Sequence, residues 1–475
     1  MFLAVGCLFA FAAVAPSLGF GTIGDMWRGA SSSSSLSSSA EGGGRKLLSA
    51  GPCRTFDKWL VDGGWVLYAV AILYLFLGIA IICDAFFEAS LEKICEKLNL
   101  SEDVAGATFM AAGSSAPELF TSTMSLVSST ATNELGVATI VGSAVFNILI
   151  IIAATVIFAG QSLQLDWKPV TRDCTFYATS IIFVLFIMAD GKVWWWEGVI
   201  SVCLYFVYVG FMTQNEKVMN WIDKKFSNKV VDEEAGGKEG KEGLKEGLEE
   251  EEEEDENPFA VPGSVSEYPM WLLSLPWYAA FTITVPDCGK EGKEHWYLVS
   301  FTMSVVWISA ISYGMVDAAA SVGCMLDIPE VVMGTLVLAA GTSVPDALAS
   351  IGVAQKGEGD MAVANAVGSN VFDIWLGLGL PWTVFLPTRG GYEEVSQKQL
   401  WPSILILAGV LGAYYISLAF NSFKLVKEHG YLYLFVYALF VIYSVVGVWR
   451  MDIYDLKDST PAAVVNATNT TNTTG

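Results

Sequence analysis

The chain has few charged residues: Lys, Arg, Asp and Glu make up 16% of its 475 residues, against about 25% in an ordinary soluble domain. Apolar residues make up 53%, and the mean hydropathy is +0.49. One or two soluble domains could not hide so much apolar surface, which excludes a soluble enzyme, a disordered chain and a disulfide scaffold. Positive charge is scarce too, and the net charge of -23 argues against nucleic-acid binding. A polytopic membrane protein remains.

The two ends of the chain differ from its apolar middle. Residues 1–20 form a short apolar block that predicts a signal peptide; because the block lacks a basic start, an uncleaved anchor is the alternative. Residues 21–60 contain a Ser/Gly tract and predict a flexible extracellular extension. The tail 451–475 holds the sequons at Asn466, Asn469 and Asn472, which are glycosylated only on the lumenal side.

Apolar stretches long enough for a membrane helix recur along the rest of the chain, as two sets of five. The first repeat, 61–213, contains predicted spans at 63–85, 103–127, 136–159, 174–189 and 194–213. The second repeat, 296–450, contains predicted spans at 296–318, 329–353, 361–386, 400–420 and 430–449. The fold class expected is therefore an all-α polytopic membrane protein of ten helices.

The segment 214–295 between the repeats predicts a cytoplasmic loop. Residues 232–256 carry 14 Asp/Glu against 3 Lys and must be solvated. They suggest a spacer, with weak calcium binding as the alternative. The apolar piece 268–286 contains Pro276 and Pro286, and we interpret it as a helix at the membrane interface rather than an eleventh span.

Lys and Arg in short loops set the orientation, with the N-terminus outside. The predicted inner segments all carry Lys or Arg, and they are 86–102, 160–173, 214–295, 354–360 and 421–429. The outer loops 128–135 and 319–328 carry neither.

Cys53 and Cys324 are then the two outer cysteines that remain once Cys7 leaves with the signal peptide, which suggests a disulfide between them.

Two polar stretches interrupted by glycine and proline share one pattern. GATFMAAGSSAPELFTS at 106–122 aligns without a gap with GTLVLAAGTSVPDALAS at 334–350, and IVGSAVFNI at 140–148 aligns with AVGSNVFDI at 366–374. The first motif covers 106–148 and the second 334–382. Their order is the same and their spacing is nearly equal, which indicates a duplication, and five spans per half give the halves opposite orientation. Matching broken helices in inverted halves are typical of a transporter's substrate site.

Glu118 and Asp346 occupy equivalent places in these motifs. A carboxylate in mid-membrane costs several kcal/mol unless it is paired or hydrated. Neither predicted span contains Lys or Arg, so a cation between the two acids is favoured over a structural salt bridge. Pro117 and Pro345 precede the acids and disturb the helix hydrogen bonds before them, which predicts free main-chain carbonyls.

Further oxygen ligands lie on the same helix faces as the acids, at i, i+3 and i+4. The full candidate set is Glu118, Asp346, Asp373, Asn147, Ser114, Ser115, Thr342, Ser343, Ser143, Ser369, Asn370 and the carbonyls of Ala111 and Ala339. Such oxygens suit Ca2+ and also Na+ or K+. The candidate set contains no His or Cys, which argues against zinc, copper and iron as its ions. Close helix packing is the alternative role for any one hydroxyl. Asp373 stands where the first half has Asn147, so it could balance one more cation.

These motifs resemble the alpha repeats of the cation/calcium exchanger superfamily, and within it the potassium-dependent sodium/calcium exchangers. The likeness extends to LDWKPVTRDCTFY at 165–177, VWWWEGV at 193–199 and VPDC at 285–288. Ser114 and Ala349 depart from the pattern of that branch, which usually has Gly and Thr there. Because Ala349 matches a place near the potassium position, the potassium requirement is a separate question.

The resemblance implies an antiporter in which Na+ runs inward while Ca2+, with K+, is carried out. Glu118 and Asp346 match its central calcium and sodium ligands, Asp373 the position linked to potassium use, and the hydroxyl and amide residues the supporting ligands. The expected substrates are Ca2+, Na+ and K+, and the expected location is the plasma membrane. No enzyme activity, cofactor, nucleic acid or obligate protein partner is indicated.

Three alternatives stay open at this point. A calcium/proton antiporter could use the same scaffold, with the acids taking protons. A calcium-permeable channel could present the same ligands, and the rate and saturation of transport would separate it from a carrier. A calcium-buffering membrane protein based on the acidic loop would lose its function when 232–256 are deleted.

Overall fold

A computed structural model gives the structure of the chain. It describes residues 63–98, 111–128, 131–159, 162–214, 259–264, 266–290, 292–355 and 359–448. The predicted signal peptide, the extension 21–60, the acidic run 232–256 and the sequons of the tail lie outside the described residues.

The first half consists of helices joined by short strands. Its elements are α3 (Trp65–Ile82), η3 (Cys83–Glu88), α4 (Ala89–Lys97), α6 (Ala111–Ser114), α7 (Ala116–Val127), α8 (Asn133–Phe146), η5 (Asn147–Ile151), α9 (Ile152–Phe158), β1 (Leu163–Gln164), α10 (Trp167–Ile187), η6 (Met188–Asp190), β2 (Lys192–Trp194) and α11 (Trp195–Met212). The segments η3 and η5 are π-helical. The sequence of α3, WVLYAVAILYLFLGIAII, is apolar on every face, as expected for a helix surrounded by lipid and protein.

The second half repeats this order after one additional helix. Its elements are α14 (Tyr268–Thr284), η7 (Glu294–Trp296), α15 (Tyr297–Leu326), α16 (Glu330–Val332), η8 (Met333–Leu338), α17 (Ala339–Thr342), α18 (Val344–Gln355), α19 (Gly359–Phe372), η9 (Asp373–Leu378), α20 (Gly379–Phe385), η10 (Leu386–Arg389), β3 (Tyr392–Glu394), α21 (Gln397–Phe420), β4 (Lys424–Leu425), α22 (Lys427–Tyr443) and η11 (Ser444–Val448). The segments η8 and η9 are again π-helical.

Within the described residues, eight helices are long and apolar enough to cross a bilayer, and a bent pair (Glu330–Thr342 with Val344–Gln355) adds a ninth. The remaining predicted span, 103–127, begins among residues that the structure does not describe. The predicted loops at 86–102 and 319–328 are wrong over most of their length, because one helix continues to Lys97 and another to Leu326. The polar α4 stays helical because it buries Leu91 and Cys95 where it packs on α15.

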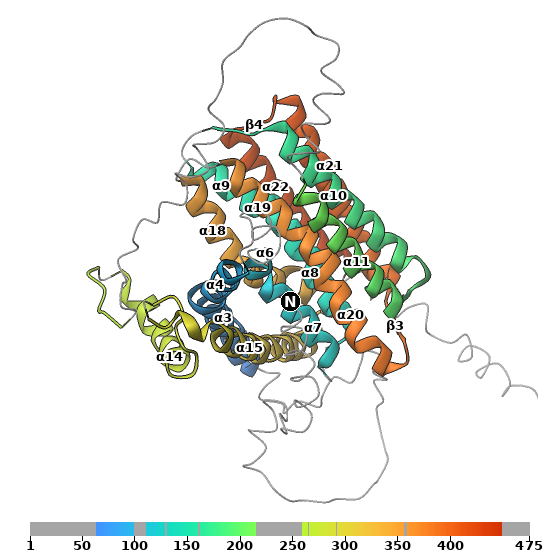
Figure 1. The fold of residues 1–475 in the computed structure, drawn as a ribbon. Helices are drawn as coiled ribbons and strands as arrows, with labels where there is room; N and C mark the ends of the chain where they lie inside the picture. The colour runs from blue at the N-terminus through green and yellow to red at the C-terminus, as the bar shows by residue number, and fades with distance from the viewer. Residues whose placement is uncertain are drawn as a thin grey trace, which may run out of the picture.

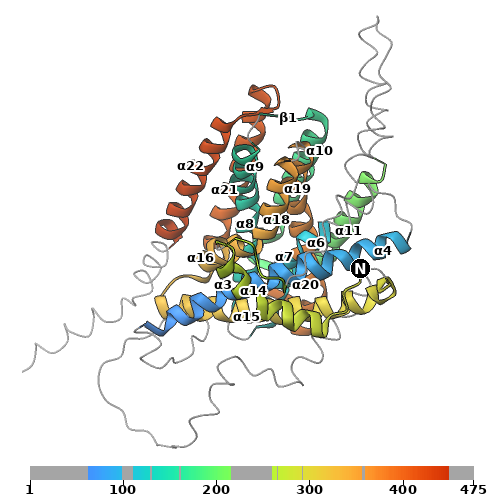
Figure 2. The same ribbon diagram turned by 90° about the vertical axis from the view of Figure 1, so that its left-hand side faces the viewer.

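The two long helices form a layer of their own. In Figure 2 the α3–α4 helix and α15 lie side by side and cross the ends of the other helices at a steep angle. The predicted interfacial helix, α14, lies alongside α3 and α15 (Figure 1). There the Trp277 indole N–H donates to the Tyr74 carbonyl at 3.1 Å.

Helices of the first half pack on helices of the second half, and each such contact occurs twice with the halves interchanged. α11 packs on α20, and its counterpart α22 packs on α9. Likewise α10 packs on α19, and its counterpart α21 packs on α8. The strands follow the same rule, because β1 pairs with β4 and β2 pairs with β3, both antiparallel. The β1–β4 ribbon lies at one end of the bundle and the β2–β3 ribbon at the other (Figures 1 and 2).

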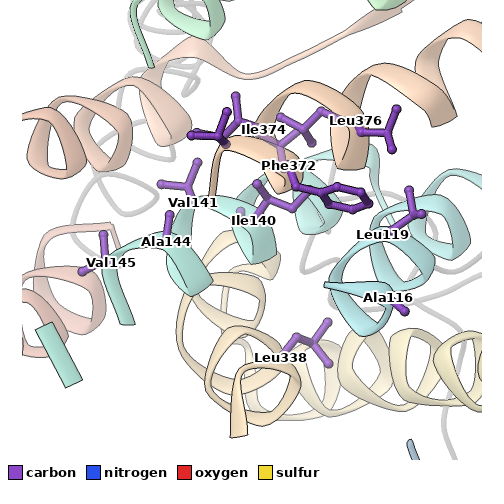
Figure 3. Packing of buried hydrophobic residues seen from close by; sticks show 14 of the residues in the cluster. Ala116, Leu119, Ile140, Val141, Ala144, Val145, Leu338, Phe372, Ile374 and Leu376 are labelled. Carbon is purple, nitrogen blue, oxygen red and sulfur yellow. The ribbon is translucent and has the colours of Figure 1, made fainter. Parts of the chain in front are cut away.

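Glycines let the two broken spans approach their neighbours closely. A Cβ atom on Gly142 of α8 would stand 2.5 Å from the Cα of Thr335 in η8, and one on Gly334 would stand 2.7 Å from the Leu135 carbonyl oxygen. Figure 3 shows apolar side chains of this region, with Ile140 of α8 next to Phe372 of α19. The broken span that contains η8 therefore packs closely on α8.

Gly142→Ala is expected to destabilise the protein by about 1–3 kcal/mol, because the new methyl group overlaps backbone atoms that cannot rotate away. Thermal unfolding of the purified protein in detergent measures this. The matched control is Gly409→Ala in α21, where the glycine is exposed and no described atom lies within 4 Å of the new Cβ. Equal stability of the two variants would contradict the close crossing.

Cys324 is disulfide-bonded, whereas the other described cysteines, Cys83, Cys95, Cys174, Cys203 and Cys288, are free. Its predicted partner, Cys53, lies outside the described residues, so the pairing itself stays a prediction.

Candidate functional site

Each polar motif forms a helix that breaks at one serine. Ser115 separates α6 from α7 with φ −89° and ψ 7°, and Ser343 separates α17 from α18 with φ −87° and ψ 2°. The two breaks thus have the same backbone conformation. Pro117 and Pro345 follow two residues later and cannot donate the hydrogen bonds that a continuous helix needs. The second break bends its span by 43°.

The breaks place Glu118 and Asp346 in the first turns of α7 and α18. Glu118 is 0% exposed and Asp346 1% exposed. The Ser343 hydroxyl donates to Glu118 Oε1 at 3.1 Å, and Ser114 lies beside Asp346. Each acid thus has a hydroxyl neighbour from the opposite half of the chain, and each sits at the positive end of a helix dipole.

A second layer begins where two α-helices become π-helical. Asn147 starts η5 and Asp373 starts η9, and both are fully buried. The Asn147 side-chain amide donates to Asn370 Oδ1 at 3.0 Å and to Ser369 Oγ at 3.4 Å. Asp373 lies close enough to interact electrostatically with Glu118 and Asp346, and Ser115 lies beside it. π-helical segments of this kind are frequent at functional sites.

Many oxygen atoms of these residues are buried without a hydrogen-bond partner. They are Ser114 Oγ, Ser115 Oγ, Thr121 Oγ1, Glu118 Oε2, Asn147 Oδ1 and both carboxylate oxygens of Asp346 and Asp373. Most buried polar atoms in proteins are hydrogen-bonded, and buried charges are paired or bind ions. The arrangement can therefore accept a desolvated cation.

The ligand set is mixed rather than purely acidic. Within the part of the chain that the structure describes, no three His, Cys, Asp or Glu side chains are placed to hold a metal ion by themselves. Hydroxyl and amide oxygens would have to complete the coordination, as hard cations such as Ca2+ accept.

Two candidate ligands, Ala339 and Ser143, are placed differently from the expectation. The Ala339 carbonyl is not free, because it accepts hydrogen bonds from Ser343 N–H at 3.2 Å and Thr342 Oγ1 at 3.3 Å. The Ser143 hydroxyl donates to the Ile140 carbonyl of its own helix. Ala349 is exposed on α18, so the structure does not place it among the buried oxygens.

Thr121 is a residue that the sequence analysis missed. Its hydroxyl is fully buried and unpartnered. It lies three positions after Glu118 in the same helix, so the i+3 spacing was the available signal. Ala111 is the first described residue of α6.

Broken helices in two corresponding halves, with Glu118 and Asp346 buried at the breaks and Asp373 buried at the start of η9, are the features of a membrane transporter for cations. The chain belongs to the sodium/calcium exchanger family: the family model described as "Sodium/calcium exchanger protein" matches residues 68–214 and 296–446. It is accordingly a multi-pass integral membrane protein.

Similar proteins cover most of the chain. Human sodium/potassium/calcium exchanger 5 is 36% identical over 414 residues, which span 79% of this chain and 82% of the relative. Mouse sodium/potassium/calcium exchanger 4 is 32% identical over 514 residues, which span 82% of each chain. The crystal structure of the H+/Ca2+ exchanger CAX matches 82% of this chain and 84% of its own, with 13% identity and a TM-score of 0.52. At that identity the match shows a shared fold alone.

Proposed function

We propose that the chain is a secondary active antiporter that exchanges Na+ for Ca2+ and carries K+ together with Ca2+. The observation that carries this function is the burial of three electrostatically interacting carboxyls, with Glu118 and Asp346 at the two helix breaks and Asp373 at the start of η9. The relatives named sodium/potassium/calcium exchangers, which match most of the chain, support the choice of ions.

Charge balance links the ions to one another. Three ionised carboxylates carry three negative charges, which one Ca2+ and one K+ neutralise, as do several Na+ ions. A buried site that keeps net charge is costly to move through a bilayer. The site therefore changes its access from one side of the membrane to the other only when it is fully loaded with one set of ions. This requirement is the basis of exchange.

The proposed roles follow the geometry. Glu118 and Asp346 are the central ligands for Ca2+ and Na+, and Asp373 is the carboxyl for K+. The supporting oxygens come from Ser114, Ser115, Thr342, Ser343, Ser143, Asn147, Ser369 and Asn370, with the carbonyl of Ala111 and the hydroxyl of Thr121. Ala339 is left out of this set because its carbonyl already accepts two hydrogen bonds.

The proposed topology is ten spans in two inverted five-helix repeats, with the N-terminus outside and 214–295 in the cytoplasm. Two observations support the inverted arrangement of the repeats. Each helix contact between the halves occurs twice with the halves interchanged, and the two strand ribbons lie at opposite ends of the bundle. The predicted signal peptide and the tail sequons support the secretory pathway, with the plasma membrane as the proposed destination. Alternating access would then come from movement of one helix group past the broken spans.

Calcium uptake into vesicles that hold the purified protein and are loaded with Na+ tests this function. The external solution contains K+, Li+ or choline, and a proton gradient replaces Na+ in a further run. Uptake that requires internal Na+ and external K+ is the expected result. Uptake driven only by protons would instead support a calcium/proton antiporter, and non-saturating flux would indicate a channel.

A further inference from the structure

Glu88, an acid outside the proposed ligand set, lies beside the site. It ends the π-helical segment η3, which packs against α6. A Cβ atom on Gly113 would stand 3.0 Å from Glu88 Cγ and 3.3 Å from Glu88 Oε1. The missing side chain at Gly113 thus makes room for the Glu88 carboxylate next to Ser114. Figures 1 and 2 both show α6 next to the α3–α4 helix.

Among the described residues, the charged groups that act on Glu88 are the acids Asp84 and Glu92 of its own helix. Glu88 in turn acts on Asp346 in the site. Lys93, the nearest lysine in the sequence, pairs with Glu96 instead, at 3.1 Å.

These acids become more buried toward the site. Asp84 and Glu92 are exposed, Glu88 is half-buried, and Asp346 is 1% exposed. The four-residue spacing of Asp84, Glu88 and Glu92 puts them on one helix face. Of the three, Glu88 is the half-buried one and the one that acts on Asp346, so Glu88 and Asp346 together form a row that leads inward.

Asp346, at the inner end of this row, has buried oxygens that could bind a cation. Both carboxylate oxygens of Asp346 and the hydroxyl of Ser114 are buried without a hydrogen-bond partner. A half-buried carboxylate close to an unpartnered buried one is unfavourable unless one of them takes up a proton or a cation passes or rests between them.

We propose that Glu88 is the outer ligand of the cation path: it binds a divalent cation between the α3–α4 helix and α6 and passes it to Asp346. The inference rests on the proposed function, since it takes the buried site as the destination of the ion. Carboxylates along low-dielectric walls raise the local cation concentration and the rate of association. Because one half-buried carboxylate binds weakly, the ion is released inward. The proposed topology makes this the cytoplasmic path.

The test compares Glu88→Gln with Glu92→Gln, which removes the same charge one turn away at an exposed position. Both variants are studied in uniformly oriented vesicles with Ca2+ on the side to which α4 leads. Glu88→Gln is expected to raise the KM for Ca2+ about three- to tenfold, because the outer ligand loses its charge, while kcat stays within about twofold of the wild type. A tenfold change in KM corresponds to ~1.4 kcal/mol. Its KM is also expected to depend less on ionic strength. Glu88→Asp should restore part of the effect, and Glu92→Gln should change KM less than about twofold.

A second measurement separates this inference from the proposed function. Stopped-flow mixing of Ca2+ with the purified protein in choline buffer follows binding without transport. Glu88→Gln is expected to slow Ca2+ association about three- to tenfold. An unchanged KM and association rate, or equal changes in Glu92→Gln, would overturn the role of Glu88. Normal Ca2+ association without Na+-dependent exchange in the wild type would instead overturn the proposed function.

Discussion

Asp346→Asn is expected to lower Na+-dependent Ca2+ uptake by at least about 100-fold, which corresponds to ~2.8 kcal/mol. The Asp346 carboxylate is 1% exposed and neither of its oxygens has a hydrogen-bond partner. Asn has the same shape but cannot neutralise a cation, so the site can no longer reach charge balance when loaded. Vesicle uptake of Ca2+ driven by internal Na+ measures the loss.

Stability distinguishes loss of the site from misfolding in this variant. A neutral amide costs less to bury than an unpaired carboxylate, so Asp346→Asn should be at least as stable as the wild type in ion-free buffer. Saturating Ca2+ should raise the melting temperature of the wild type but not of the variant. Asp190→Asn is the matched control, because Asp190 is exposed and caps a loop at Lys192 N–H. Calcium transport by Asp346→Asn at the wild-type rate would refute the site.

Asp373→Asn is expected to abolish the requirement for K+ while Ca2+ uptake continues within about tenfold of the wild-type rate. The change gives the second half the same residue as Asn147 and leaves two carboxylates, which one Ca2+ neutralises alone. Uptake is measured at fixed Ca2+ with external K+ varied against choline. A K+ dependence that survives the substitution would count against the role of Asp373.

Ala349→Thr provides the comparison for potassium use. Ala349 is exposed on α18, so a threonine there should leave the K+ dependence of the wild type unchanged. A new or stronger K+ requirement in Ala349→Thr would show that this position, rather than Asp373, sets potassium use.

The sequence predicted those parts of the fold that depend on local patterns. Pro117 and Pro345 predicted the two helix breaks, which the structure places at Ser115 and Ser343. Hydropathy placed nine of the predicted spans, which have counterparts among the described helices. It ended the first of them at residue 85, because the segment ASLEKICEK is polar overall, although it remains helical and buries Leu91 and Cys95.

Other features depend on contacts between distant residues. The hydrogen bond from Ser343 to Glu118 joins residues 225 positions apart, so no local pattern could reveal it. The π-helical segments that start at Asn147 and Asp373 pack on helices of the other half, η5 on α22 and η9 on α7. Glu88 was assigned to a loop once the first span was ended too early, although its four-residue spacing from Asp84 and Glu92 was visible.

The hydrogen bonds that join polar residues of the two halves have a consequence for biosynthesis. Glu118 receives its hydroxyl from Ser343, and Asn147 donates to Ser369 and Asn370. The N-terminal half leaves the ribosome first, and these partners do not yet exist when its spans are inserted. Until the second motif has been made, the first half lacks these partners and the ligands that the second half contributes to the proposed site. The capacity to bind and move ions therefore arises only once both motifs are present.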